Sequence, residues 1–132
     1  MVTKRILIID DRKELLHLMR RVLEDELYQV ATLQEGREGF MHVKMLLPDL
    51  LILDLKLGDI SGQDILKQLK NDPVTAGIPV IIYTGAVLEA DDVVQLINSD
   101  PPFYSGVSLL RKPFDLTTLL DKLEKMLGQS EC

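Results

Sequence analysis

Three aspartates, a threonine and a lysine lie where apolar runs end in this 132-residue chain: Asp10, Asp11, Asp54, Thr84 and Lys112. A buried strand does not tolerate an unpaired carboxylate, because removing the charge from water costs more than the strand gains. We therefore expect these side chains to lie at the ends of strands. There they either cap a turn or perform chemistry.

If the three aspartates share one pocket, their charges repel one another. A hard divalent cation relieves this repulsion, and Mg²⁺ binds one or two carboxylates while keeping waters and phosphate oxygens as its other ligands. Lys112 and Thr84 then suit two oxygens of a phosphoryl group. In that arrangement Asp54 is the candidate nucleophile, since a carboxylate can form an aspartyl phosphate.

Five apolar runs are the candidate strands that position these residues. Four are nearly continuous, at residues 5–10, 50–55, 79–83 and 107–111, and a fifth at residues 28–32 is weaker and more polar. Continuous apolar runs are typical of strands that are covered on both faces, whereas the weaker run suits an edge strand.

Helical patterns separate the strands. The first is an amphipathic stripe at three- and four-residue spacing, made of Leu15, Leu18, Met19, Val22 and Leu23. The others cover residues 34–46, 61–71, 93–97 and 115–127. We expect Ser61 with Asp64 to cap the third helix, and Gly128 to end the fifth.

Strands that alternate with helices predict one parallel sheet with helices on both faces, in a single α/β domain. In open sheets of this kind the binding crevice lies at the carboxyl ends of the strands. The strand-end aspartates, the threonine and the lysine are therefore expected to converge on one edge of the sheet.

Four stretches, in order, resemble the receiver domain of two-component response regulators: "ILIIDD", "LDLKLGDISG", "PVIIYTG" and "LLRKPF". Each is a weak signal alone, and the order of all four carries the resemblance over essentially the whole chain. It implies a doubly wound, flavodoxin-like (βα)₅ fold with a five-stranded parallel sheet of strand order 2-1-3-4-5. It also implies a receiver domain over residues 1–128 and a short tail at 129–132.

The resemblance implies a metal site as well. Asp11 and Asp54 would bind Mg²⁺ together with the main-chain carbonyl of Lys56, while Asp10 would hold a metal-bound water.

By the same resemblance, Asp54 accepts a phosphoryl group from a histidine kinase or a phosphotransfer protein. Thr84 and Lys112 would contact that group, and the bond from Lys112 to Pro113 would be cis. The domain would catalyse its own phosphorylation and slow hydrolysis without being an enzyme for an external substrate. It would signal to an unknown downstream protein by direct contact, and it has the potential to form a homodimer.

Three features depart from the family pattern. Gly58 stands where the family usually has proline, and Leu109 occupies the position of the family's switch aromatic. The interval between the threonine and the lysine is long, with the excess in residues 98–106. We therefore hypothesise that Phe103 or Tyr104, within that excess, supplies the missing aromatic contact.

Composition narrows the classes of function. The net charge is −6, so the chain lacks the positive surface that nucleic acids or anionic membranes require. The longest apolar run is far shorter than the roughly 20 residues of a membrane span. The N-terminus meets acidic residues early, unlike a secretory signal. With Cys132 as the single cysteine, we expect a cytoplasmic protein without an internal disulfide.

Simpler interpretations remain beside this one. Asp10 and Asp11 could merely cap a helix. A receiver fold that docks partners without phosphate is a second alternative, favoured by Leu109 and the long 98–106 segment. An aspartate-nucleophile phosphatase of the haloacid-dehalogenase type is the third, but Lys56 occupies the position where such enzymes carry an acid.

Overall fold

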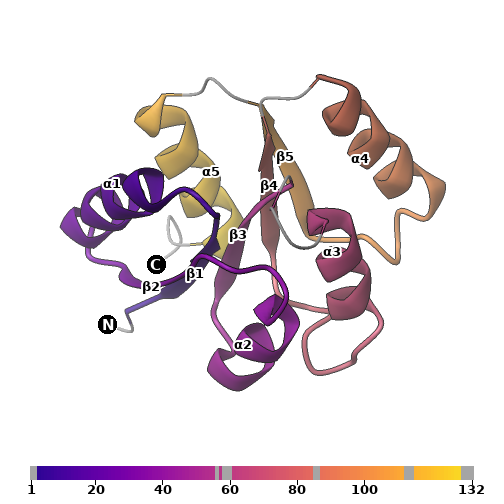
Figure 1. Ribbon diagram of the computed structural model, residues 1–132, viewed down its shortest axis with the longest axis horizontal. Coiled ribbons are helices and arrows are strands. Elements are labelled where there is room, and N and C mark those ends of the chain that lie inside the picture. Colours follow the sequence, from indigo (N-terminus) through magenta and orange to yellow (C-terminus); the bar gives the residue numbers. More distant parts are fainter. Residues whose placement is uncertain (1–2, 56, 58–60, 85–86, 112–114, 129–132) are drawn as a thin grey trace.

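The computed structural model describes residues 3–55, 57, 61–84, 87–111 and 115–128. Five parallel strands form one sheet in the order β2-β1-β3-β4-β5 (Figure 1). The strands are β1 (Arg5–Ile9), β2 (Gln29–Leu33), β3 (Leu50–Asp54), β4 (Val80–Thr84) and β5 (Val107–Arg111). The helices are α1 (Lys13–Asp25), α2 (Gly39–Leu46), α3 (Gly62–Lys70), α4 (Val87–Ser99) and α5 (Leu116–Leu127). This confirms the predicted fold and strand order.

Helices cover both faces of the sheet. One face packs against α1 and α5, and the other packs against α2, α3 and α4 (Figure 1). The alternating side chains of each strand supply the two cores, so the central strands are apolar throughout, as strands covered on both faces must be. None of the helices in the described part of the chain has the length and apolarity needed to cross a lipid bilayer.

Two of the helix ends that the sequence predicts are formed by side-chain caps, and a third is formed by a glycine. Ser61 accepts a hydrogen bond from the main-chain N–H of Gln63 at 3.1 Å, and Asp115 accepts one from Thr118 at 2.8 Å. Gly128 ends α5 in the left-handed conformation, which glycine adopts without steric penalty.

Three details of the helices differ from the sequence prediction. The predicted start of α2 at residue 34 is wrong, because α2 begins at Gly39 and is preceded by a turn closed by the bond from the Gly39 N–H to the Gly36 carbonyl. The predicted fourth helix is too short, since α4 spans 13 residues. In α1 the buried stripe is Leu16, Met19 and Leu23, whereas Leu18 is half exposed because it lies two residues, or about 200°, around the helix from Leu16.

The long segment before β5 packs at the amino-terminal end of the sheet. A series of turns covers residues 100–106, and the Gly106 carbonyl accepts a hydrogen bond from the Val80 N–H at the start of β4. The buried ammonium group of Lys70 donates to the carbonyls of Ala76 at 2.8 Å and Ser105 at 2.7 Å. Lys70 therefore joins the end of α3 to the loops that precede β4 and β5, and burial lowers its pKa.

Candidate functional site

The carboxyl-terminal ends of β1 and β3 lie side by side and carry the three aspartates. Ile9 pairs with Leu53 in the register of the sheet, so the next residues, Asp10 and Asp54, lie at the same level. Asp10 is fully buried and Asp54 is 4% exposed. Asp11, one residue further along, is exposed.

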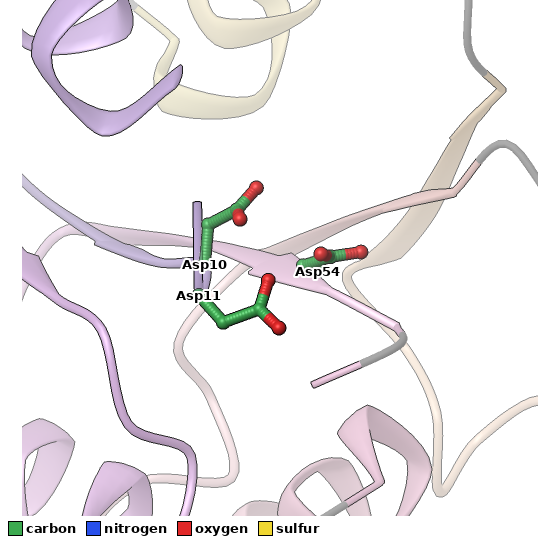
Figure 2. A group of neighbouring side chains, drawn as sticks. All are labelled: Asp10, Asp11 and Asp54. Atoms are coloured by element: carbon green, nitrogen blue, oxygen red, sulfur yellow. The ribbon is translucent and has the colours of Figure 1, made fainter. Parts of the chain in front are cut away.

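The three aspartates form one cluster, in which a carboxylate oxygen from each lies within 4.8 Å of the others. Figure 2 shows the Asp10 carboxylate turned toward α1 and α5, while those of Asp11 and Asp54 lie lower and nearer to each other. The sequence prediction that these residues meet at one edge of the sheet is confirmed. Three like charges this close repel one another unless a cation is present.

The buried Asp10 carboxylate is held by hydrogen bonds from two parts of the chain. Its Oδ1 accepts from the main-chain N–H of Arg12 at 2.7 Å, and the Arg12 guanidinium lies 3.4 Å from Oδ2. The hydroxyl of Tyr83, on β4, also donates to Oδ2. These donors offset the cost of burying the charge.

Tyr83 is fully buried in the core that faces α1 and α5. Burial raises the pKa of its phenol, and the hydrogen bond to Asp10 and the charges of Asp10 and Asp54 act in the same direction. The phenol therefore keeps its proton and acts as a hydrogen-bond donor at neutral pH.

The start of α3 packs directly against the main chain that carries Asp54. The N–H of Gly62 donates to the Leu55 carbonyl at 2.9 Å. A Cβ atom at residue 62 would lie 2.7 Å from the Asp54 carbonyl oxygen and 2.9 Å from the Leu55 Cα. Only glycine fits this approach without moving the main chain of Asp54.

Thr84 ends β4, next to β3, and is almost fully buried. In the register it pairs with Arg111, the residue before Lys112. Lys112, Pro113, Lys56 and Gly58 lie outside the described residues, so the roles predicted for them stay predictions.

The candidate switch residues lie in different parts of the fold. Leu109 is in the middle of β5, partly buried on the face covered by α4. Phe103 and Tyr104 precede β5 at the amino-terminal end of the sheet, where their rings meet edge to face at 4.9 Å. The length of β4, about 13 Å, separates that end from Thr84. The hypothesis that Phe103 or Tyr104 supplies the aromatic contact in place of Leu109 therefore stays a prediction.

Sequence reasoning missed the contacts that Arg12, Tyr83 and Gly62 make at the site. Arg12 follows the acidic pair directly, so its nearness could have been noticed. Tyr83 stands at the end of an otherwise aliphatic run, and a phenol beside a strand-end threonine was a visible signal. Gly62 is the last residue of the stretch "LDLKLGDISG", but that stretch alone does not show which atoms the glycine approaches.

The donor set suits a hard divalent cation. Carboxylate oxygens are the ligands that Mg²⁺ prefers, and Mg²⁺ bound by one or two carboxylates takes waters or phosphate oxygens as its other ligands. Such a cation would offset the negative charge of the cluster. A phosphoryl group could then bind to the cation through its oxygens.

A family model described as the response regulator receiver domain matches residues 6–124. The chain is 30% identical over 127 residues to the phosphate regulon transcriptional regulatory protein PhoB of Rhizobium meliloti (strain 1021), covering 96% of this chain and 53% of that protein. It is 34% identical over 127 residues to the DNA-binding dual master transcriptional regulator RpaA of Synechocystis sp. (strain ATCC 27184 / PCC 6803 / Kazusa), covering 96% and 50%. The chain spans about half the length of these two curated relatives.

Solved structures share the fold. A CheY-like response regulator receiver domain protein from Methanospirillum hungatei JF-1 is 28% identical, with a TM-score of 0.78 over 98% of both chains. The chemotaxis protein CheY4 of Vibrio cholerae is 22% identical, with a TM-score of 0.81 over 95% of this chain and 99% of that one, a likeness of fold alone.

Proposed function

The chain belongs to the response regulator receiver domain family, and we propose that Asp54 accepts a phosphoryl group from the phosphohistidine of a histidine kinase or phosphotransfer protein. The observation that carries this proposal is the cluster of Asp10, Asp11 and Asp54, with Asp54 at the end of a central strand. Asp54 lies beside two more carboxylates, a donor set that suits a hard divalent cation.

In the proposed transfer, a carboxylate oxygen of Asp54 attacks phosphorus as the phosphorus–nitrogen bond of the donor breaks. The electron pair of that bond stays on the histidine nitrogen, which takes up a proton. The product is an aspartyl phosphate, and water later hydrolyses it slowly. When bound, Mg²⁺ supplies positive charge beside the transferring oxygens.

The residues of the chain have separate tasks in this proposal. Asp11 and Asp54, with the Lys56 carbonyl, hold the cation, and Asp10 holds one of its waters. Thr84 donates a hydrogen bond to one phosphoryl oxygen. Lys112 places a compact positive charge beside another.

The output of the domain is proposed to be a phosphorylation-dependent contact with a downstream protein or a second copy of the chain. Phosphorylation adds about −1.5 to −2 charges at Asp54. Switching from mostly inactive to mostly active takes about 5.5 kcal/mol of differential stabilisation. A few charge-assisted hydrogen bonds, at roughly 1.5–3 kcal/mol each, supply energy of that order.

The proposal is tested by incubating the protein with MgCl₂ and acetyl phosphate and measuring the intact mass. We expect wild type and the control Asp64→Asn, which changes an exposed aspartate on α3, to gain one phosphoryl group. Asp54→Asn should gain none. A folded wild-type protein that gains no mass would contradict the proposal. It would favour the phosphate-independent docking module, which is consistent with Leu109 at the position of the family's switch aromatic.

A further inference from the structure

Tyr83 connects two strands that are not neighbours in the sheet. It lies on β4 directly before Thr84, is fully buried, and donates its hydroxyl hydrogen to Asp10 at the end of β1. Because β3 lies between β1 and β4, the side chains of Tyr83 and Asp10 together bridge two strand spacings, about 10 Å, across the strand that ends in Asp54. The phenol therefore crosses the proposed site without being part of the proposed reaction.

The hydrogen bonds of Asp10 come from two separate places, which fixes the direction of its carboxylate. The Arg12 N–H binds Oδ1 from the loop that follows β1. Tyr83 binds Oδ2 from β4. A carboxylate held at both oxygens cannot rotate toward Asp11 or Asp54, and it lies within 4.8 Å of both.

We propose that Tyr83 is a positioning residue of the metal site: its hydroxyl holds the Asp10 carboxylate in one orientation and so raises the affinity of the aspartate cluster for Mg²⁺. Removing a group that orients a direct metal ligand typically lowers metal affinity 10- to 100-fold. Asp10 is proposed to act through a metal-bound water, so we expect the lower end of that range. This inference rests on the proposed function, because Mg²⁺ is the cation proposed there.

The experiment is a calorimetric titration of MgCl₂ into wild type, Tyr83→Phe and Tyr104→Phe. Tyr83→Phe removes the hydroxyl and keeps the ring, so we expect its Kd for Mg²⁺ to rise about tenfold. Tyr104→Phe is the matched control, since it removes a hydroxyl from a buried tyrosine at the other end of the sheet. Its Kd should stay within about twofold of wild type.

A double-mutant cycle shows whether Tyr83 acts through Asp10. In the Asp10→Asn background, Tyr83→Phe should cause no further loss of Mg²⁺ affinity. A metal-free readout accompanies it: the shift of the urea midpoint caused by Tyr83→Phe should be larger in wild type than in Asp10→Asn.

Two results would overturn the inference alone: tight wild-type binding that Tyr83→Phe leaves unchanged, or an equal loss of affinity in both backgrounds. Wild-type protein that binds no Mg²⁺ would instead contradict the proposed function and, with it, this inference.

Discussion

At the carboxyl-terminal end of the sheet, Asp10 and Asp54 are buried beside an exposed Asp11, whereas at the amino-terminal end Lys70 is buried between two main-chain carbonyls. Both ends remove charge from water, which is costly in either case. Lys70 donates to two main-chain carbonyls of the fold, and burial still lowers its pKa. Asp10 is held by hydrogen bonds from Arg12 and Tyr83, while the three carboxylates of the cluster lie close to one another.

We infer that the charge of Lys70 has a structural role, whereas the charges of the aspartate cluster have a functional one. A buried charge satisfied by the main chain needs nothing from outside the protein. In the proposed function, a bound cation offsets the repulsion within the cluster of like charges. Removing a charge should therefore lower the free energy of unfolding at the amino-terminal end of the sheet and raise it at the carboxyl-terminal end.

The largest effect on stability is expected from a methyl group added beside Asp54. Gly62→Ala places a Cβ against the main chain of Asp54 and Leu55, and overpacking of this kind costs about 1–3 kcal/mol. Gly77→Ala, at the amino-terminal end, is the control, because a Cβ there meets nothing within 4 Å. Urea denaturation should show a loss for Gly62→Ala alone. Equal effects at both glycines would show that the carboxyl-terminal end is not the more tightly packed.

Removing the positive charge at the amino-terminal end should destabilise the protein. Lys70→Met leaves two carbonyls without their donor, at a cost of about 2 kcal/mol in the free energy of unfolding. Lys67→Met, an exposed position on the same helix, should change it by less than about 0.5 kcal/mol. Mg²⁺ affinity should be the same in both variants. A loss of Mg²⁺ binding in Lys70→Met would break the separation between the two ends.

Removing a negative charge at the carboxyl-terminal end should have the opposite sign. Asp11→Asn relieves repulsion in the cluster and should stabilise the metal-free protein by about 1 kcal/mol. Excess MgCl₂ should then stabilise wild type more than the variant, as thermal unfolding would show. Asp121→Asn, on the exposed face of α5, is the control and should change neither value. A destabilised Asp11→Asn protein would mean that the cluster is not under repulsion.

The smallest expected effect is a pH dependence carried by Lys70. Because burial lowers its pKa in the folded state, the unfolded chain binds more protons between that lowered value and the ordinary 10.5. The free energy of unfolding of wild type relative to Lys70→Met should therefore rise with pH between the lowered pKa and 10.5. Above 10.5 it should rise no further. Urea titrations of both proteins at several alkaline pH values measure the difference. A difference that falls as pH rises would contradict the assigned direction.

The sequence was most informative where local pattern and burial coincide. Four nearly continuous apolar runs and one weaker, more polar run predicted the five strands, and the strand-end positions of Asp10, Asp11 and Asp54 predicted the cluster. The exposure of Leu18 was missed because the choice between neighbouring helix faces depends on where the helix docks. The bond from Tyr83 to Asp10 joins residues 73 positions apart, and no local rule links them.

The same limit applies to Lys70. A lysine at the end of an amphipathic helix is usually solvated, and its burial here depends on the loops that contain Ala76 and Ser105. The sequence shows an excess length in residues 98–106, but it does not show that Ser105 in this segment contacts Lys70 at the end of α3. Only the assembled tertiary structure brings the carbonyls to the ammonium group.

The central claim is that the carboxyl-terminal end is completed by a cation and a phosphoryl group, while the amino-terminal end is complete by itself. Amide NMR spectra with and without MgCl₂ and beryllofluoride, a mimic of the phosphoryl group, test this most directly. We predict large shifts for Asp10, Asp11, Asp54 and Thr84, and unchanged signals for Lys70, Ala76 and Ser105. Unchanged signals for these four residues at the carboxyl-terminal end of the sheet would contradict the proposed function.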